Sequence, residues 1–207
     1  MSRKTIVLFA ATLLTYLFLS NTTPAQAHEW PQAFMWGAGN SAFQVEGSPV
    51  DSDWFRFTHQ RSAIKDGTNA DRATDFWNRY AEDFQLAKEL GSNTFRISIA
   101  WERIQPKQNE WNESALDHYE KILIEMRKVG LEPIVTLQHF VLPAWLSEQG
   151  GLTSPQFPKY FTQYALKVVS RLMKAPAQVQ FWMTFNEPEI LVFCGYFWSC
   201  WPPKHFL

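Results

Sequence analysis

The sequence has 207 residues, of which 46% are hydrophobic and 19% charged, and its formal net charge is −1. This balance is typical of a globular protein and excludes a disordered or fibrous chain. No run of Lys and Arg is long enough to predict a nucleic-acid-binding face, so no nucleic-acid partner is expected. Aromatic residues are abundant, at 16%. Such side chains form cores and also stack on sugar rings, and composition alone favours the core.

The first 27 residues predict a secretory signal peptide. Arg3 and Lys4 give a basic start, residues 5–19 are almost wholly apolar, and residues 25–27 read Ala-Gln-Ala, like a cleavage site. The apolar run is shorter than the roughly 20 residues that a membrane-spanning helix needs, so no stable membrane span is expected after cleavage. We expect residues 28–207 to be exported to the periplasm or the extracellular space. An uncleaved N-terminal anchor is the alternative.

After the signal, the chain predicts strands and helices in alternation. A short aromatic strand over residues 33–38 is followed by a polar loop over 47–71. A helix over 74–90, a strand over 93–99, a helix over 114–129, a strand over 133–138, a helix beginning at Ser154-Pro155 and a strand over 179–185 complete the order. This alternation predicts an α/β fold with a parallel sheet and helical crossovers.

Each predicted helix carries apolar residues three and four positions apart, which places them on one face. Gly91 and Gly130 are expected just after the first two helices, and Asn112 or Ser114 is expected to cap the second. For the third helix, Ser154 is the expected N-cap and Pro155 the first helical residue. The inward-facing residues are Phe76, Tyr80, Phe84 and Ala87, then Leu116, Tyr119, Leu123 and Met126, then Phe157, Phe161, Tyr164 and Val168.

Polar side chains stand at or near the C-terminal ends of all four predicted strands. They are Gln44 and Glu46, then Arg96 and Glu102, then His139, then Asn186 and Glu187. In a (β/α)8 barrel these ends form the active-site face, and a doubly wound sheet also uses them. The position of these residues therefore predicts a site without deciding between the two architectures.

The strongest local signal is the segment 184–188, Thr-Phe-Asn-Glu-Pro. A carboxyl group at a strand end in an aromatic setting would be desolvated, which would raise its pKa and suit Glu187 to act as a general acid. Cleavage of a glycosidic bond needs such an acid to protonate the leaving oxygen. Asn186 supplies an amide beside it that can bind a sugar hydroxyl.

The wider set of motifs resembles glycoside hydrolase family 1, the β-glucosidase and β-galactosidase family. The motifs are Phe34-Met35-Trp36-Gly37-Ala38, Gln44-Val45-Glu46-Gly47, Phe95-Arg96-Ile97-Ser98-Ile99, Thr136-Leu137-Gln138-His139-Phe140 and Trp182 to Pro188. They cover nearly all of residues 30–190 in the family's order. The resemblance implies a (β/α)8 TIM barrel, here about its first four βα units. A different barrel family that shares only Asn-Glu-Pro fits less well.

The resemblance also implies a role for each matching residue. Glu187 would be the catalytic acid/base, and Asn186 would bind the hydroxyl beside the anomeric carbon. Gln44 and His139 would bind the far hydroxyls of the sugar. Arg96 would lie near the nucleophilic carboxylate and keep it ionised. No metal or organic cofactor is implied, because two carboxyl groups perform this chemistry unaided.

A few positions depart from the family's pattern, and one further contact is implied. Trp145 would line the cleft. Glu102 stands where the family usually has a small residue, so an extra carboxyl group is expected near the cleft. Leu152 and Asn40 are also unusual. The preference between glucosides, galactosides and other β-glycosides stays open.

The family's nucleophile, a Glu in a Glu-Asn-Gly motif, has no counterpart in these 207 residues. We therefore expect the truncated front half of a retaining enzyme for small or oligosaccharide β-glycosides, inactive by itself. One alternative is a non-catalytic sugar-binding or interaction module. Another is a half barrel completed by a separate C-terminal half or by self-association.

The only two cysteines, Cys194 and Cys200, lie close together in the sequence. Export would permit a disulfide between them, and two free thiols are an equal alternative. Two cysteines alone are too few for a structural metal site, which usually has four Cys or His ligands.

Overall fold

The computed structural model describes residues 29–204, so the predicted signal peptide lies outside the described residues. The chain divides between Phe34 and Met35 into two units, which are described separately. In the first, the Phe34 amide donates to the Pro31 carbonyl at 2.8 Å, and the Trp30 and Phe34 rings lie 4.5 Å apart. Among the described residues no helix is long and apolar enough to cross a membrane.

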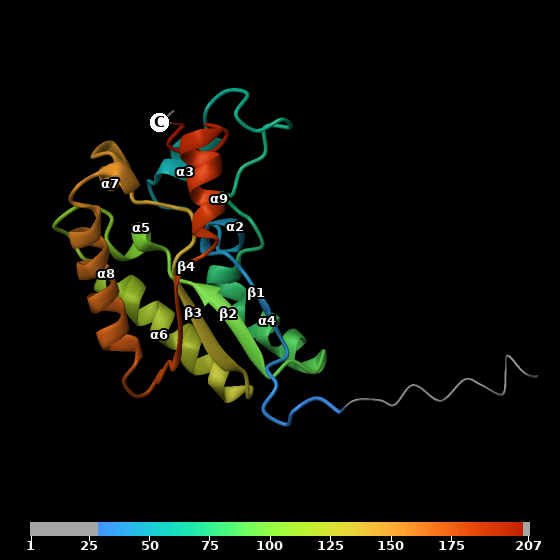
Figure 1. Ribbon diagram of the computed structural model, residues 1–207. Helices are drawn as coiled ribbons and strands as arrows, with labels where there is room; N and C mark the ends of the chain where they lie inside the picture. The colour runs from blue at the N-terminus through green and yellow to red at the C-terminus, as the bar shows by residue number, and fades with distance from the viewer. Residues whose placement is uncertain (1–28, 205–207) are drawn as a thin grey trace, which may run out of the picture. The chain divides into compact units, whose positions relative to one another are not determined.

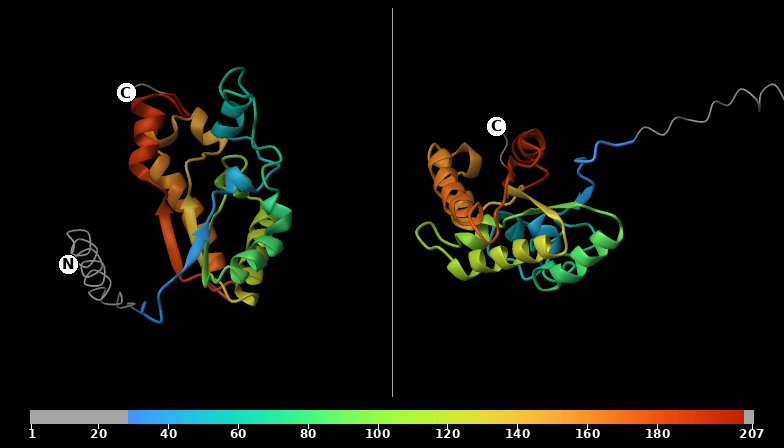
Figure 2. Two further views of the ribbon diagram at one scale, coloured as in Figure 1. Left: turned by 90° about the vertical axis from the view of Figure 1, so that its right-hand side faces the viewer. Right: turned by 90° about the horizontal axis from the view of Figure 1, so that it is seen from below.

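The second unit is built on a parallel four-stranded sheet with the order β1-β2-β3-β4, which confirms the predicted fold. The strands are β1 (Gly37–Gly39), β2 (Thr94–Ser98), β3 (Glu132–Gln138) and β4 (Phe181–Phe185). Three long helices connect them, α4 (Phe76–Glu89), α6 (Glu113–Lys128) and α8 (Phe157–Leu172). All three helices lie along one side of the sheet (Figures 1 and 2).

The core lies between the sheet and these helices, and the predicted apolar faces form it. Phe84 of α4 packs edge-on against Phe95 of β2, with ring centroids 5.4 Å apart. Tyr164 of α8 stacks on Trp101 at 4.6 Å, and its buried hydroxyl donates to the Leu137 carbonyl at 2.9 Å. Burial of such large side chains supplies most of the favourable free energy of folding.

The predicted ends of the helices are confirmed for α4 and α6 and wrong for α8. The Asn112 side chain caps α6 by accepting from the Ala115 amide at 3.1 Å, and Gly91 has the positive φ of 88° expected after α4. However, α8 begins at Phe157. The Phe157 amide donates to the Ser154 carbonyl in a turn before the helix, so Ser154 is not the N-cap.

Short helices that the sequence did not predict follow each strand. The predicted polar loop over 47–71 contains α3 (Asp53–Thr58), which Ser52 caps. The others are α2 (Ala42–Val45), α5 (Trp101–Ile104), α7 (Ala144–Glu148) with the 3-10 turn η1 (Gly151–Thr153), and α9 (Pro188–Val192) with the π-helical turn η2 (Phe193–Phe197). They gather at the end of the sheet where the strands finish, at the top of Figure 1. This end carries the polar residues singled out in the sequence.

Candidate active site

Backbone hydrogen bonds beyond the strands hold the strand ends level with one another. The Asn40 amide donates to the Arg96 carbonyl, and the Asn186 amide donates to the Gln138 carbonyl, both at 2.9 Å. In the last pair of strands Gln138 is opposite Phe185. The residues that follow these positions, among them His139 and Asn186, therefore emerge side by side at one edge of the sheet.

Gln44 lies on α2, which is fixed from two sides. The first amide of α2 donates to Ser98 Oγ at 2.7 Å. At the other end of the helix, Glu46 Oε2 accepts from Arg103 Nε at 2.8 Å, and Glu46 Oε1 accepts from the Tyr119 hydroxyl at 2.7 Å. Because Glu46 is buried and fully engaged, it holds the turn in place. Gln44 is exposed and remains available to a ligand.

Gln44 and His139 line one cavity of about 420 Å³. Four aromatic side chains line it with them, Phe43, Trp54, Phe140 and Trp201. The rings contact one another, with Trp54 5.4 Å and Phe140 5.0 Å from Trp201. Aromatic faces combined with a few uncharged polar groups suit a ligand that has both hydroxyl groups and apolar faces, such as a sugar.

The turn that presents His139 is held by its neighbour Gln138. Gln138 Oε1 accepts from the Phe140 amide at 3.1 Å, and Gln138 Nε2 donates to the Val141 carbonyl at 3.3 Å. Phe140 has a φ of 71°, which is unusual for a residue other than glycine and is most frequent at functional sites. Burial, and then the charge of Arg96, lower the pKa of His139 to about 4, so the imidazole is neutral near pH 7.

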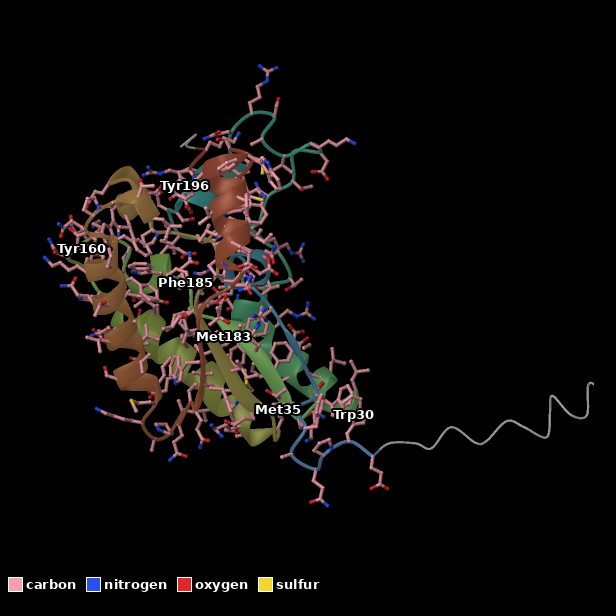
Figure 3. All side chains as sticks on the ribbon, viewed as in Figure 1. Trp30, Met35, Tyr160, Met183, Phe185 and Tyr196 are labelled. Carbon is pink, nitrogen blue, oxygen red and sulfur yellow. The ribbon has the colours of Figure 1, made fainter. Side chains whose placement is uncertain are left out.

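Arg96 connects the second strand to the fourth. Its Nη1 donates to the buried Asn186 Oδ1 at 3.0 Å and lies 3.4 Å from Met183 Sδ. Met183 and Phe185 mark β4 in Figure 3. Gly39 of β1 leaves room for the arginine, because a Cβ there would lie 3.0 Å from Arg96 Nε. The sequence placed Arg96 beside a nucleophile, and the structure shows Asn186 as its hydrogen-bond partner.

Glu187 follows Asn186 in the sequence and lies between β4 and α9. It is the N-cap residue of α9 and has φ 41° and ψ 63°, a left-handed conformation that is strained for a glutamate. Its side chain is exposed. The desolvated aromatic setting predicted for this carboxyl group is therefore not formed by the described residues, and this prediction needs correction.

Trp145 does not line the cavity that Gln44 and His139 share. It lies on α7, where its Nε1 donates to the Gln105 carbonyl at 2.9 Å. Its ring packs edge-on at 5.2 Å against Tyr160 of α8, which Figure 3 labels. These contacts give Trp145 a packing role in the structure.

Cys194 and Cys200 are free thiols, so the structure favours that alternative over a disulfide. Over residues 29–204 no group of three or more His, Cys, Asp or Glu side chains could hold a metal ion.

Trp54 and Trp201 are cavity residues that the sequence did not single out. Trp54 Nε1 is buried and has no hydrogen-bond partner within the described part of the chain, although it belongs to a cavity-lining side chain. The abundance of tryptophan was visible in the sequence, but nothing in its spacing separated these two from tryptophans of the core.

A parallel sheet of successive βα units, whose three connecting helices all lie on one side of it, defines the class: part of a (β/α)8 barrel rather than a doubly wound sheet. The family description "Glycosyl hydrolase family 1" matches residues 26–206, and the chain belongs to this family. It is 36% identical over 193 residues to "Coniferin beta-glucosidase" of Pinus contorta and 35% identical over 188 residues to "Probable inactive beta-glucosidase 14" of Oryza sativa subsp. japonica.

Solved structures agree with the sequence relatives. β-Glucosidase 2 of Trichoderma reesei superposes with a TM-score of 0.81 at 34% identity over 86% of this chain, and the family 1 β-glucosidase of Thermotoga maritima superposes with 0.81 at 31% identity over 86%. The matches cover 90% of this chain with the pine enzyme and 87% with the rice protein. The chain spans 37% and 36% of the lengths of those two relatives, and 40% of each of the two solved chains.

Proposed function

We propose that this chain carries the sugar-binding and acid/base half of a retaining β-glycosidase, with Glu187 as the general acid and base. The observation that carries the proposal is the position of Glu187, which follows Asn186 at the end of β4 in a member of this family. Glu187 would first protonate the leaving oxygen and then deprotonate the water that releases the sugar. Its strained backbone supports a functional placement.

The cavity supports an uncharged sugar as the ligand. Gln44 offers an amide, His139 is a neutral imidazole near pH 7, and Trp54 Nε1 is a donor without a partner in the described chain. None of these groups carries a charge that would select a phosphate or an ammonium. The relatives named β-glucosidases favour a β-glucoside or a related β-glycoside as the substrate.

Hydrolysis that retains the configuration of the anomeric carbon requires a second carboxyl group, the nucleophile, about 5 Å from that of the acid/base. The sequence holds no Glu-Asn-Gly, the motif of the family's nucleophile. We therefore expect these 207 residues alone to bind sugar without cleaving it. Arg96, which already bonds Asn186, would keep a nucleophilic carboxylate supplied beside it ionised.

A second candidate is a half barrel that a C-terminal half completes, and the sheet favours it. Within the described residues β4 pairs only with β3, and Phe181 and Met183 of β4 are 44% and 37% exposed. Edge strands with exposed apolar side chains tend to pair with further strands. A C-terminal half barrel carrying the nucleophile would pair with the open edge of β4, cover its exposed apolar side chains and supply the missing carboxyl group.

We also propose that the protein is exported and that residues 1–27 are removed. The basic start, the apolar run and Ala25-Gln26-Ala27 support this. N-terminal sequencing of the secreted protein should begin at His28. Recovery of the uncleaved chain in membranes would instead identify these residues as an anchor.

The proposed reaction is tested by linking residues 28–207 to the C-terminal half barrel of a family 1 relative. Hydrolysis of an alkyl β-glucoside should be absent with the 207-residue chain and present with the linked protein. Glu187→Gln should slow it by about 100- to 10,000-fold, whereas Glu189→Gln, a matched exposed acid on α9, should not. Full activity of the Glu187→Gln protein would contradict the proposal.

A further inference from the structure

A buried carboxyl group that the proposed reaction does not use, that of Glu102, lines a small cavity that shares Phe43 and His139 with the proposed sugar-binding cavity. Glu102 belongs to α5, directly after β2, and its side chain is 3% exposed. Within the described residues, its Oε2 atom has no hydrogen-bond partner. An unpartnered buried oxygen of this kind is unfavourable unless another group or a water molecule satisfies it.

The imidazole of His139 also has a buried polar atom, Nδ1, without a hydrogen-bond partner among the described residues. Glu102 and His139 both line a second, small cavity of about 10 Å³. The other side chains around it are apolar, among them Phe43, Leu137 and Val141. A space of roughly 10–15 Å³ is enough for one water molecule, provided that polar partners are present.

Burial, together with the charges around the small cavity, leaves both groups neutral near pH 7. Burial raises the pKa of Glu102 to about 8, Arg103 opposes this rise, and Glu46 and Asp53 add to it. Burial and the charge of Arg96 lower the pKa of His139 to about 4. A protonated carboxyl group can therefore donate a hydrogen bond toward His139 Nδ1, which accepts one when the ring proton is on Nε2.

We propose that Glu102 is a positioning residue that donates, through one water molecule in the small cavity, to His139 Nδ1 and thereby fixes the tautomer with the proton on Nε2. The proposal rests on the proposed function in one respect, that His139 faces the sugar. The carboxyl proton bonds the water oxygen, and a water proton bonds Nδ1. The Nε2–H group then always offers a donor to the larger cavity, which selects for a hydroxyl group that accepts there.

Nitrogen-15 NMR of the imidazoles in the full 207-residue chain tests the proposal without any substrate. At pH 6.5 the wild-type chain should show His139 mainly with the proton on Nε2. Glu102→Gln should keep this tautomer, because its amide can still donate, and Glu102→Met, of similar size, should lose it. His118, whose Nε2 lies 2.8 Å from the Trp77 carbonyl, is the internal control and should not change.

A pH series on the wild-type chain gives a second readout that needs no variant. Above the pKa of Glu102 the carboxylate accepts from the water molecule and no longer donates to it, so the nitrogen-15 shifts of the His139 ring should change between about pH 7 and pH 9. Glu102→Gln should abolish the change. Asp53 and Glu46 also face Glu102, and Tyr119 and Tyr164 titrate far higher, so persistence of the change in Glu102→Gln would assign it to another group.

The proposal is overturned if wild-type His139 carries its proton on Nδ1 at pH 6.5, or if Glu102→Met keeps the wild-type tautomer. Adding methyl β-glucoside tests the proposed function separately. A response of the His139 signals to the sugar without the expected tautomer would support sugar binding and reject the role of Glu102. The expected tautomer without any response to the sugar would support the role of Glu102 and reject sugar binding.

Discussion

Arg96 interacts with residues at the ends of three other strands. It hydrogen-bonds Asn186 after β4, and its charge reaches His139 after β3. Gly39 of β1 leaves space for its side chain. A single cation therefore orients the amide beside Glu187 and adds to the effect of burial in lowering the pKa of the imidazole.

Replacing Arg96 should raise the pKa of His139. A neighbouring positive charge disfavours the imidazolium, so Arg96→Met should move this pKa from about 4 toward the ordinary value of 6.5, without reaching it because burial persists. A pH titration of the His139 ring by NMR measures the change. Arg79→Met, which removes an exposed arginine of α4, is the control, and an unchanged pKa in Arg96→Met would show that the charge does not reach His139.

Glu102 should make the protein less stable as the pH rises. Its pKa is about 8 in the folded chain and near 4.5 when unfolded, so the unfolded chain loses the proton first and the free energy of unfolding falls from about pH 4.5 to pH 8. Asp53, with a pKa of about 7, acts in the same direction below pH 7. His139 opposes both below pH 6.5, because there the unfolded imidazole binds the proton more readily.

Urea unfolding between pH 6.5 and pH 8.5 isolates the effect of the carboxyl groups. The wild-type chain should lose stability over this range, and Glu102→Gln should lose clearly less because the amide does not titrate. Glu82→Gln, at an exposed position of α4, should follow the wild type. Parallel curves for wild type and Glu102→Gln would contradict the assigned pKa.

At the scale of the element, the long helices could be predicted from the sequence and the short ones could not. Tyr119 and Met126 fall on one face of α6 because apolar residues recur at helical spacing over four turns, and both are fully buried. Helices of four to six residues, such as α2 and α5, show no such recurrence. Side-chain contacts between residues far apart in the sequence stabilise them, among them the ion pair between Glu46 and Arg103. The partners in such contacts cannot be read from a sequence.

The candidate site, too, has features that could be predicted from the sequence and features that could not. The strand ends that carry Gln44, His139 and Glu187 were predictable because parallel strands finish at one edge. The bond from Arg96 to Asn186 joins positions 90 residues apart and follows only from the register. The exposure of Glu187 was not predictable, because it depends on which other segments surround the carboxyl group.

The cap of α6 should contribute measurably to stability. Asn112→Ala removes the acceptor of the Ala115 amide and should lower the free energy of unfolding by about 1 kcal/mol, the usual cost of losing an N-cap. Urea unfolding at pH 6.5 measures it. Gln163→Ala, an exposed change within α8, should have little effect, and equal losses in both variants would argue against a cap.

At the scale of the whole molecule, the described chain presents apolar surface at its last strand and at its C-terminal helical segment. Phe181 on β4 is 44% exposed. The Phe193 ring contacts those of Phe197 and Trp198, and these three residues are 45%, 58% and 66% exposed. Exposed apolar groups of this size usually mark surfaces that another segment or chain covers.

The 207-residue chain should therefore self-associate when it is studied alone. Phe181→Lys places a charge on the open edge strand, which opposes pairing, and should shift the chain toward the monomer. Sedimentation velocity across a concentration series measures this. Leu166→Lys, which charges an exposed apolar position on α8 instead, is the control. Equal association of wild type and Phe181→Lys would show that the β4 edge is not the surface involved.

The most direct test of the acid/base role is the dependence of hydrolysis on the leaving group, measured in residues 28–207 linked to a family 1 C-terminal half barrel. A general acid matters most when the leaving oxygen is strongly basic. Glu187→Gln should therefore slow cleavage of an alkyl β-glucoside by about 100- to 10,000-fold, and slow bond cleavage of a dinitrophenyl β-glucoside far less. An equal loss for both substrates would contradict the assignment of Glu187 as the acid.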